Sequence, residues 1–243
     1  MLTSNGGKPR QNAKDDLKSR GLFITFEGID GSGKTAQCKR LVQYLRRLGY
    51  KVRATREPGG TAVGEKVRAI LLASQDHLSP LTELVLFYAA RAQHIEDVIR
   101  PALDRGEIVV TDRFNDCSFV YQGYARGLGN RVVRLLDRAI CGPVQPDLTL
   151  VLDLDARVAL DRALRRESRR GSMQSRFEAE GLKFQERVRR GYRARARRDP
   201  ERVRLIPADR PPKEVEAEIQ RVVGEGLGVR SQKSGAGSKK SEV

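Results

Sequence analysis

The stretch Phe23-Ile-Thr-Phe-Glu-Gly-Ile-Asp-Gly-Ser-Gly-Lys-Thr35 decides the fold of this chain. An apolar run from Leu22 to Phe26 has the composition of a strand and ends at Glu27. The segment from Ala36 to Leu48 carries apolar residues at helical spacing. A glycine-rich loop lies between the two. Strand, glycine loop and helix thus follow one another in the order that a phosphate-binding loop requires.

The residue types of this loop suit a polyphosphate. Its glycines let backbone N–H groups turn toward an anion, and the N-terminus of the helix adds partial positive charge. Lys34 can reach the β- and γ-phosphates, and the Thr35 hydroxyl can ligate Mg²⁺. A plain glycine turn is the alternative, but the complete motif in this context argues against it. We therefore predict a nucleoside triphosphate site formed by Gly28, Ile29, Asp30, Gly31, Ser32, Gly33, Lys34 and Thr35.

Composition excludes several classes of protein. The chain has 243 residues, of which 39% are hydrophobic, enough for one core of α/β type. No run approaches the ~18 apolar residues of a membrane span, and the polar start of the chain does not resemble a secretory signal. With three widely spaced cysteines and two histidines, neither a disulfide framework nor a zinc cluster is expected, and a cytoplasmic location fits.

The pattern along the chain alternates between strands and helices. Residues 1–20 and 228–243 have the composition of disordered tails, which leaves 21–227 as one domain. Further strands are predicted at Lys51–Arg56, Ile108–Asp112, Leu148–Asp153 and Val203–Ile206. Further helices are predicted at Val63–Leu72, Leu81–Leu103, Asn130–Cys141, Ala156–Arg166, Phe177–Arg198 and Pro212–Leu227. This alternation predicts an α/β fold of the P-loop NTPase type, with a parallel sheet flanked by helices.

The net charge of +16 is concentrated in arginine-rich segments. Between Arg157 and Arg198 there are fourteen arginines against five acidic residues. This region could bind nucleic acid, or it could be a solvated helical face. A third interpretation, an arginine-bearing lid over phosphates at about 165–177, fits best beside a triphosphate site.

Three predicted strands end in polar residues that suit chemistry. Glu27 leads into the glycine loop, Arg56 and Glu57 follow the second strand, and Asp112 and Arg113 follow the third. In parallel sheets ligands bind at the carboxyl ends of the strands. Asp112 suits a carboxylate near the hydration shell of Mg²⁺, and Arg113 suits a guanidinium between phosphates. An ordinary surface ion pair is the alternative for these two.

Several motifs, taken together, resemble the thymidylate kinase family. They are Gly28-Ile-Asp-Gly-Ser-Gly-Lys-Thr35, Arg56-Glu-Pro-Gly-Gly-Thr61, Phe87-Tyr-Ala-Ala-Arg91, Asp112-Arg-Phe114, Ser118-x2-Tyr-Gln-Gly123 and Pro146-Asp-Leu-Thr-Leu150 with Val-Leu-Asp153. They follow the order of the family from about Leu22 to Leu227. The resemblance implies transfer of the γ-phosphoryl group of ATP to dTMP, with Mg²⁺, in a homodimer. It also makes nucleic acid and membranes unexpected partners.

The resemblance assigns roles residue by residue. Asp30, Lys34, Arg113 and a lid arginine would be catalytic, with Asp30 accepting from the 3′-hydroxyl. Substrate contacts are expected from Glu57, Arg68, Phe87, Arg91, Arg113, Ser118, Tyr121 and Gln122. Among these, Phe87 would stack on thymine, Arg91 would donate to O4, Ser118 and Gln122 would bond around the base, and Tyr121 would disfavour ribose. The expected metal ligands are Thr35, Glu57 and Asp112.

The lid is where this chain departs from the family. The glycine loop has Gly31-Ser32 and no arginine, which implies that the lid supplies the catalytic arginine. The candidates are Arg165, Arg166, Arg169 and Arg170, with Arg166 preferred. Phe114 and Cys117 also stand where the family usually has hydroxyl-bearing or histidine side chains.

Two alternatives to a dTMP kinase stay open on the sequence. One is another nucleoside-monophosphate or deoxynucleoside kinase on the same scaffold. The other is a P-loop protein whose arginine-rich region binds nucleic acid. The presence of Lys34, Thr35, Asp30 and Arg113 together favours an enzyme.

Overall fold

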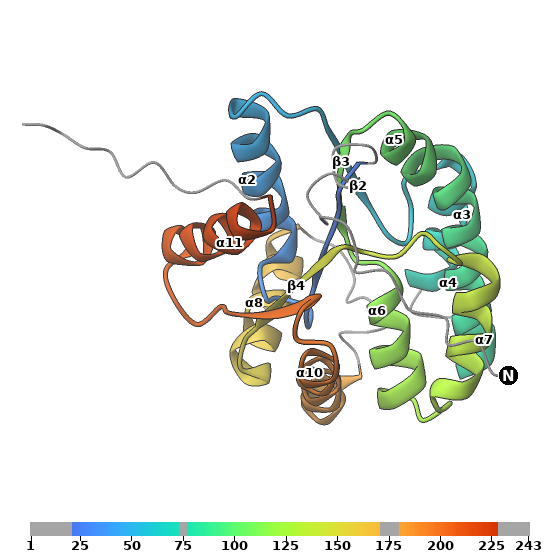
Figure 1. The fold of residues 1–243 in the computed structure, drawn as a ribbon. Coiled ribbons are helices and arrows are strands. Elements are labelled where there is room, and N and C mark those ends of the chain that lie inside the picture. The colour runs from blue at the N-terminus through green and yellow to red at the C-terminus, as the bar shows by residue number, and fades with distance from the viewer. Residues whose placement is uncertain (1–20, 73–76, 171–179, 228–243) are drawn as a thin grey trace, which may run out of the picture.

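A parallel sheet forms the centre of the molecule. The computed structural model describes residues 21–72, 77–170 and 180–227, with the side chains of 166–170 outside that description. Within these residues the sheet has five strands in the order β2-β3-β1-β4-β5, and Figure 1 shows the strands in the middle of the molecule with helices on both sides. The strands are β1 (Phe23–Glu27), β2 (Val52–Arg56), β3 (Ile108–Asp112), β4 (Leu148–Asp153) and β5 (Val203–Pro207). The predicted α/β fold with a parallel sheet is confirmed.

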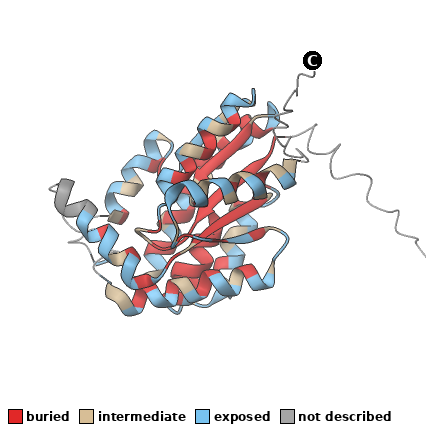
Figure 2. Ribbon diagram, turned by 90° about the vertical axis from the view of Figure 1, so that its left-hand side faces the viewer, coloured by how far each residue is buried: buried red, intermediate tan, exposed pale blue. Residues whose placement is uncertain are grey.

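Burial follows from the position of each strand in the sheet. The three inner strands β1, β3 and β4 are buried almost throughout, which suits their continuous apolar runs. The edge strand β2 has only half-buried and exposed residues, and the edge strand β5 has both buried and exposed ones. In Figure 2 the strands form a buried slab between helices that are exposed on their outer sides.

Helices cover both faces of the sheet. They are α2 (Lys34–Arg47), α3 (Ala62–Leu72), α4 (Pro80–His94), α5 (Arg100–Asp104), α6 (Asn115–Ser118), α7 (Asn130–Ile140), α8 (Ala156–Arg170), α10 (Gly181–Arg198) and α11 (Pro212–Leu227). Leu41 of α2 and Ile219 of α11 share one hydrophobic core with Ile24. Leu84 of α4 and Val133 of α7 share a second core with Phe23 on the opposite side of β1. Successive β1 side chains therefore serve two cores.

The predicted single helix Leu81–Leu103 has a different form in the structure. It contains a π-helical segment, η1 (Ile95–Ile99), between α4 and α5. Pro101 is the second residue of α5, just after this segment. Because a proline ring would clash with the carbonyl four residues earlier in a regular α-helix, a widened turn accommodates it. The prediction also missed α6 and a second π-helical segment, η2 (Phe119–Ala125). Short irregular turns carry no clear helical period.

Some predictions fall on residues that the structure does not describe. The expected tails at 1–20 and 228–243 lie outside the described residues, as do residues 171–177 of the expected lid. Helix α10 begins at Gly181 in the structure. The sequence predicted its start at Phe177, which lies outside the described residues. No helix among the described residues is long and apolar enough to cross a bilayer.

The register of the sheet brings the polar strand ends together. Phe26 of β1 pairs with Asp112 of β3, and Glu27 pairs with Val151 of β4. Arg56 of β2 pairs with Asp112 from the other side. The strand ends that carry Glu27, Arg56 and Asp112 therefore lie along one edge, as expected for the ligand-binding edge of a parallel sheet.

Candidate functional site

The glycine loop after β1 wraps around the amino group of Lys34. Lys34 is the first residue of α2, and its Nζ donates to the Ile29 carbonyl at 2.8 Å and lies 3.8 Å from Asp30 Oδ1. Gly31 has a φ of 81°, and a Cβ there would lie 1.9 Å from the Ala159 carbonyl oxygen. A side chain is therefore excluded from this turn on both counts.

The electrostatics of the loop favour an anion. Burial and then the charge of Arg113 lower the pKa of Lys34 to about 8. Gly33 precedes α2 without a side chain that could cap the helix, so the first N–H groups of α2 are offered to a ligand. A polyphosphate placed here would meet a buried ammonium, helix N–H groups and a guanidinium.

Two of the predicted metal ligands are in direct contact. The Thr35 hydroxyl donates to Asp112 Oδ2 across the gap between α2 and the end of β3. No group of three or more His, Cys, Asp or Glu within the described ranges could hold a metal unaided. A hydroxyl and one carboxylate fit Mg²⁺ that arrives with a nucleotide, because Mg²⁺ commonly keeps waters and takes phosphate oxygens as ligands.

Arg113 joins the glycine loop to the helical segment η2. Its Nη2 donates to Asp30 Oδ1 at 2.6 Å and to the Tyr121 hydroxyl at 3.2 Å, and its Nη1 donates to the Gly28 carbonyl at 3.2 Å. The backbone of Arg113 has a φ of 76°, the left-handed region that is unfavourable for a side chain. Such conformations persist where the surroundings determine them, often at functional sites.

Glu27, at the end of β1, holds the backbone next to Arg113. Its Oε1 accepts from the Phe114 amide at 2.9 Å, and its Oε2 accepts from the Tyr192 hydroxyl at 2.6 Å. Burial raises the pKa of Glu27 to about 7, against the opposing charge of Arg113. Sequence analysis placed Glu27 only at a strand end. Its contact with Tyr192 of α10, far along the chain, has no local signal.

Arg91 is completely buried beside the end of β2. Its Nε donates to Glu57 Oε2 at 2.8 Å, its Nη1 to Ser118 Oγ at 3.1 Å and its Nη2 to the Phe114 carbonyl at 3.0 Å. The guanidinium also lies over the rings of Tyr88 and Phe114, 4.6 and 5.2 Å from their centroids. Among the described residues these contacts use one of the two N–H groups of Nη1, so the other could donate to a ligand.

Glu57 is held by two basic side chains. Its second oxygen, Oε1, lies 3.0 Å from His94 Nδ1. Burial alone would raise the pKa of Glu57, but the charge of Arg91 and the hydrogen bond with His94 outweigh it and lower this pKa. Both oxygens thus have protein partners, and the predicted role as metal ligand stays a prediction. Sequence analysis did not single out His94, whose only signal was its place one turn after Arg91.

The predicted base contacts form two facing rows. Phe87 and Arg91 lie at four-residue spacing along α4, after Glu83 at the same spacing, which was not predicted, and Ser118 and Gln122 lie four residues apart on α6 and η2. Arg91 contacts Ser118, and Gln122 Nε2 donates to Glu83 Oε1 at 2.6 Å. Phe87, which is buried, therefore lies on α4 between two residues, Glu83 and Arg91, that are hydrogen-bonded to the opposite row.

Two further predictions concern Arg68 and the lid arginines. Arg68 donates to the Pro58 carbonyl at 2.9 Å, which ties α3 to the Arg56–Thr61 loop. Arg165 is exposed on α8, and the side chain of Arg166 lies outside the described residues. The assignment of Arg166 as the catalytic lid arginine stays a prediction.

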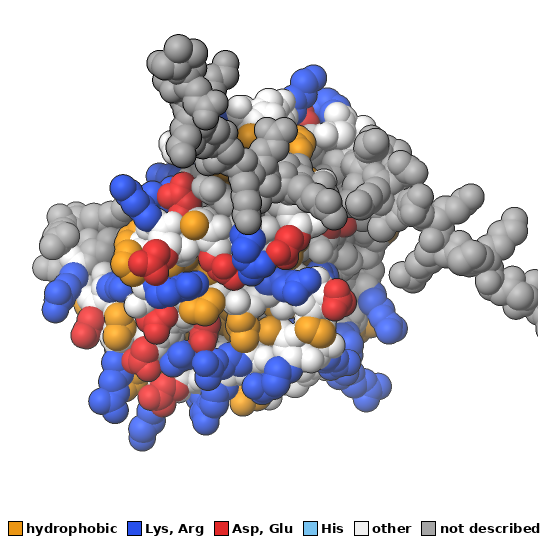
Figure 3. Space-filling view, turned by 60° about the vertical axis from the view of Figure 1, so that its left-hand side comes forward, with side chains coloured by type: hydrophobic (Ala, Val, Ile, Leu, Met, Phe, Trp, Pro, Cys, Tyr) orange, Lys and Arg blue, Asp and Glu red, His pale blue; other side chains and the backbone are white. Residues whose placement is uncertain are grey.

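Many arginines of α10 have partners within the fold. Arg189 and Arg193 pair with Asp153 at the end of β4 at 2.7 and 3.0 Å, and Arg195 pairs with the buried Asp116. On the face in Figure 3, Lys and Arg side chains are interspersed with acidic ones. Part of the positive charge of α10 is therefore paired with carboxylates of the same fold.

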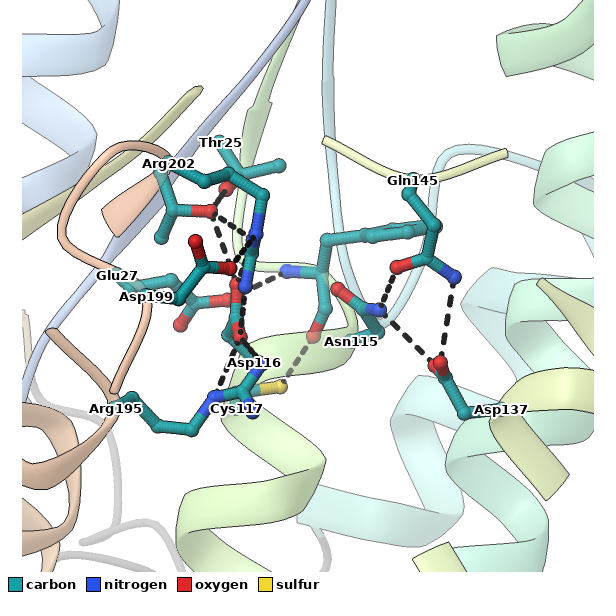
Figure 4. Close-up of polar contacts among 12 residues, drawn as sticks. Thr25, Glu27, Asn115, Asp116, Cys117, Asp137, Gln145, Arg195, Asp199 and Arg202 are labelled. Atoms are coloured by element: carbon teal, nitrogen blue, oxygen red, sulfur yellow. Dashed lines mark hydrogen bonds and ion pairs between the residues drawn. The ribbon is translucent and has the colours of Figure 1, made fainter. Parts of the chain in front are cut away.

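A buried ion-pair network holds α6, the helix that carries Ser118. Asp116 on α6 accepts from Arg202 Nη1 at 2.6 Å, from Arg195 Nε at 3.0 Å and from Thr149 Oγ1 of β4 at 2.9 Å. Figure 4 shows its carboxylate between the two guanidinium groups. The neighbouring Asn115 donates to Asp137 and Gln145 at 3.0 and 2.7 Å. The network thus anchors α6 to the sheet and to α10.

Replacing Asp116 with alanine should lower the free energy of unfolding by about 3 kcal/mol, because two guanidinium groups lose their buried partner. Burial would raise the pKa of Asp116, but hydrogen bonds and charge from Arg202 and Arg195 lower it from 3.8 to about 2. This stabilisation, about 2 kcal/mol, is present above pH 3.8 and is lost as the pH falls through 2.

Urea unfolding over this pH range measures both effects, with Asp116→Asn as the control that keeps the shape and removes the charge. The difference in stability between the wild type and Asp116→Asn should shrink toward acid pH. A constant difference would contradict the assigned pKa.

Comparisons with known proteins agree with this geometry. A sequence-family model described as thymidylate kinase matches residues 26–219. The thymidylate kinase of Desulfovibrio desulfuricans is 48% identical over 197 residues, covering 80% of this chain and 91% of that protein. The thymidylate kinase of Pseudomonas savastanoi pv. phaseolicola is 46% identical over 211 residues, covering 86% and 98%.

A solved structure gives the same result in three dimensions. The crystal structure of thymidylate kinase from Ehrlichia chaffeensis superposes with a TM-score of 0.67 at 34% identity, covering 84% of this chain and 98% of that one. The family model, the two relatives and this structure agree along most of the chain. By its sequence and its fold, the chain belongs to the thymidylate kinase family.

Proposed function

We propose that this protein transfers the γ-phosphoryl group of ATP to dTMP, giving dTDP and ADP. The bond between the γ-phosphorus and its bridging oxygen breaks as a dTMP phosphate oxygen bonds to that phosphorus. The acceptor phosphate is ionised near neutral pH, so no side chain has to activate it as a base. Catalysis then depends on positioning and on neutralising negative charge.

The described side chains suit these tasks. The glycine loop and Lys34 bind the triphosphate, and Arg113 neutralises charge between donor and acceptor. Thr35 and Asp112 would hold Mg²⁺, which neutralises phosphate charge when bound. Asp30, which is held by Arg113, would orient the sugar of the acceptor. Arg68 and Arg113 would bind its phosphate, and Tyr121 would face its sugar.

One observation above all supports thymine as the base. Gln122 Oε1 is buried and accepts no hydrogen bond from the described residues, and Arg91 has one N–H to offer. Thymine presents a donor at N3 and an acceptor at O4, which complements this pair. Cytosine presents the reverse at both positions, and each mismatch leaves buried polar groups unpaired.

An acceptor panel tests the proposal. With ATP and Mg²⁺, we expect the highest kcat/KM for dTMP, about 10–200-fold lower values for dUMP, which lacks only one methyl group, and much lower values for dCMP. AMP, GMP and thymidine serve as further acceptors. Equal kcat/KM for dCMP and dTMP would overturn the assigned base contacts, and a preference for AMP or GMP would indicate another nucleoside-monophosphate kinase.

Assembly and location belong to the same proposal. We infer a homodimer through α3 and α4, where Val63, Ile70, Leu81 and Val85 are exposed apolar residues. Light scattering measures the mass of the particle. All three cysteines are buried thiols, which suits the reducing cytoplasm.

A further inference from the structure

Glu83 is a buried carboxylate to which the proposed function gives no role. It lies in the first turn of α4 and has no exposed surface. Its Oε1 accepts from Gln122 Nε2 at 2.6 Å and from Arg126 Nε at 2.9 Å. A carboxylate in the first turn of a helix also favours the helix dipole, but an exposed side chain would serve that purpose equally well.

Arg126 holds the partner of Gln122 in place. Its Nη1 donates to Glu180 Oε1 at 2.7 Å, just before α10. Its guanidinium also lies 5.1 Å from the centroid of the Phe184 ring. Arg126 is therefore held independently of Gln122, and it holds the carboxylate of Glu83 toward η2.

The contact with Glu83 decides which way the amide of Gln122 points. The two ends of a glutamine amide have opposite hydrogen-bonding character, because its NH2 group only donates and its oxygen only accepts. An ionised carboxylate only accepts, so the NH2 end must face Glu83. The oxygen then turns away from Glu83, and it is this atom that is buried without a partner among the described residues.

This unpaired oxygen lies in the row that faces the base. Gln122 is one helical turn from Ser118, and their partners Glu83 and Arg91 lie on either side of Phe87 on α4. A pyrimidine over Phe87 would present its N3 to the Gln122 amide. An acceptor there matches the N3–H of thymine or uracil and opposes the unprotonated N3 of cytosine.

We propose that Glu83 is a specificity-determining residue: by holding the amide of Gln122 in one orientation, it makes the pocket accept pyrimidines with N3–H and reject cytosine. Glu83 does not touch the substrate and acts through Gln122. This inference rests on the proposed function and adds to it the residue that orients the Gln122 amide, which would meet N3 while Arg91 meets O4.

Two substitutions separate the effect of a hydrogen-bond acceptor at position 83 from the effect of its negative charge. In Glu83→Gln, the new side-chain oxygen can still accept from Arg126 and Gln122, so the orientation of Gln122 is retained. In Glu83→Met, a side chain of similar length has no acceptor, and the Gln122 amide can present either end to the base. The measured quantity is the ratio of kcat/KM for dTMP to that for dCMP.

We expect this ratio to fall ~10-fold or more in Glu83→Met, as for the loss of one buried hydrogen-bond preference. In Glu83→Gln it should stay within about threefold of the wild type. Both substrates are measured on the same preparation, so a smaller folded fraction changes both values equally and cancels. Glu83→Ala is a second apolar variant in case Glu83→Met does not fold.

The same substitution in a Gln122→Ala background tests the route of the effect. If Glu83 acts through Gln122, Glu83→Met should leave the ratio of this variant unchanged. An unchanged ratio in both apolar single variants, or an equal fall in the Gln122→Ala background, overturns the inference. A wild type without preference for dTMP over dCMP would instead refute the proposed function.

Discussion

Replacing Arg113 with methionine should lower kcat for dTMP about 10³-fold or more, the range for an arginine that neutralises a transferring phosphoryl group. Arg113 is placed for this task because one guanidinium contacts Asp30, Tyr121 and the Gly28 carbonyl. Its removal takes away a positive charge that stabilises the transition state more than the ground state, because negative charge moves between donor and acceptor during the transfer. Binding of ATP, which also depends on the loop N–H groups and Lys34, should weaken far less.

The pH dependence gives this variant a second signature. The charge of Arg113 helps burial to lower the pKa of Lys34 to about 8. In the wild type, kcat/KM for ATP should therefore fall as the pH rises through 8, because kcat/KM reports the free enzyme and Lys34 loses its proton. In Arg113→Met this fall should move to higher pH.

Steady-state kinetics with ATP varied at saturating dTMP, from pH 6 to about 10 to span the pKa of lysine, measure both effects. Arg100→Met is the matched control, because Arg100 is an exposed arginine on α5 whose partner is Glu96 at 2.7 Å. Its kcat should stay within about twofold, as for an exposed ion pair. A kcat for Arg113→Met as high as that of this control would remove Arg113 from the mechanism.

Replacing Arg91 with methionine should destabilise the protein by about 3–5 kcal/mol, because it leaves Glu57 as a buried charge without its main partner. Adding Glu57→Gln should restore much of this stability, because the neutral amide carries no charge to bury. Activity toward dTMP should not return, since the donor to the base is still absent. Stability and activity are thus expected to separate in the double variant.

Urea unfolding and dTMP kinetics on the single and double variants test this separation. Arg56→Met is the control, because the Arg56–Glu65 ion pair at 2.9 Å is exposed, and such pairs contribute about 0–1 kcal/mol. If Arg91→Met were as stable as Arg56→Met, the Arg91–Glu57 pair would not stabilise the fold. Recovery of activity in the double variant would show that Arg91 acts only through Glu57.

Local patterns were enough to predict most of the fold. Glycines and the apolar period on either side of Lys34 act over a few residues, so they indicate strand, loop and helix without knowledge of the rest. The apolar runs of β1, β3 and β4 likewise predict buried parallel strands. The failures, η1 and the α6–η2 segment, lie where short turns or Pro101 break the regular period.

The candidate site was predicted as a set of residue types, and the tertiary structure decided their partners. Sequence motifs nominated Arg91, Glu57 and Gln122, but nothing local indicated that Arg91 is buried against Glu57 or that Gln122 donates to Glu83. Partner contacts such as Asp116 with Arg195 and Arg202 join residues 79 and 86 positions apart.

By itself, the sequence determined the nucleotide-binding loop, the parallel sheet and the polar edge at which its strands end. Only the tertiary structure decided which carboxylate neutralises which guanidinium and which hydrogen-bonding atoms remain for a base. The reason is physical. Backbone conformation responds to neighbours along the chain, whereas the partner of a buried polar group is whichever complementary group the packing brings within about 3 Å.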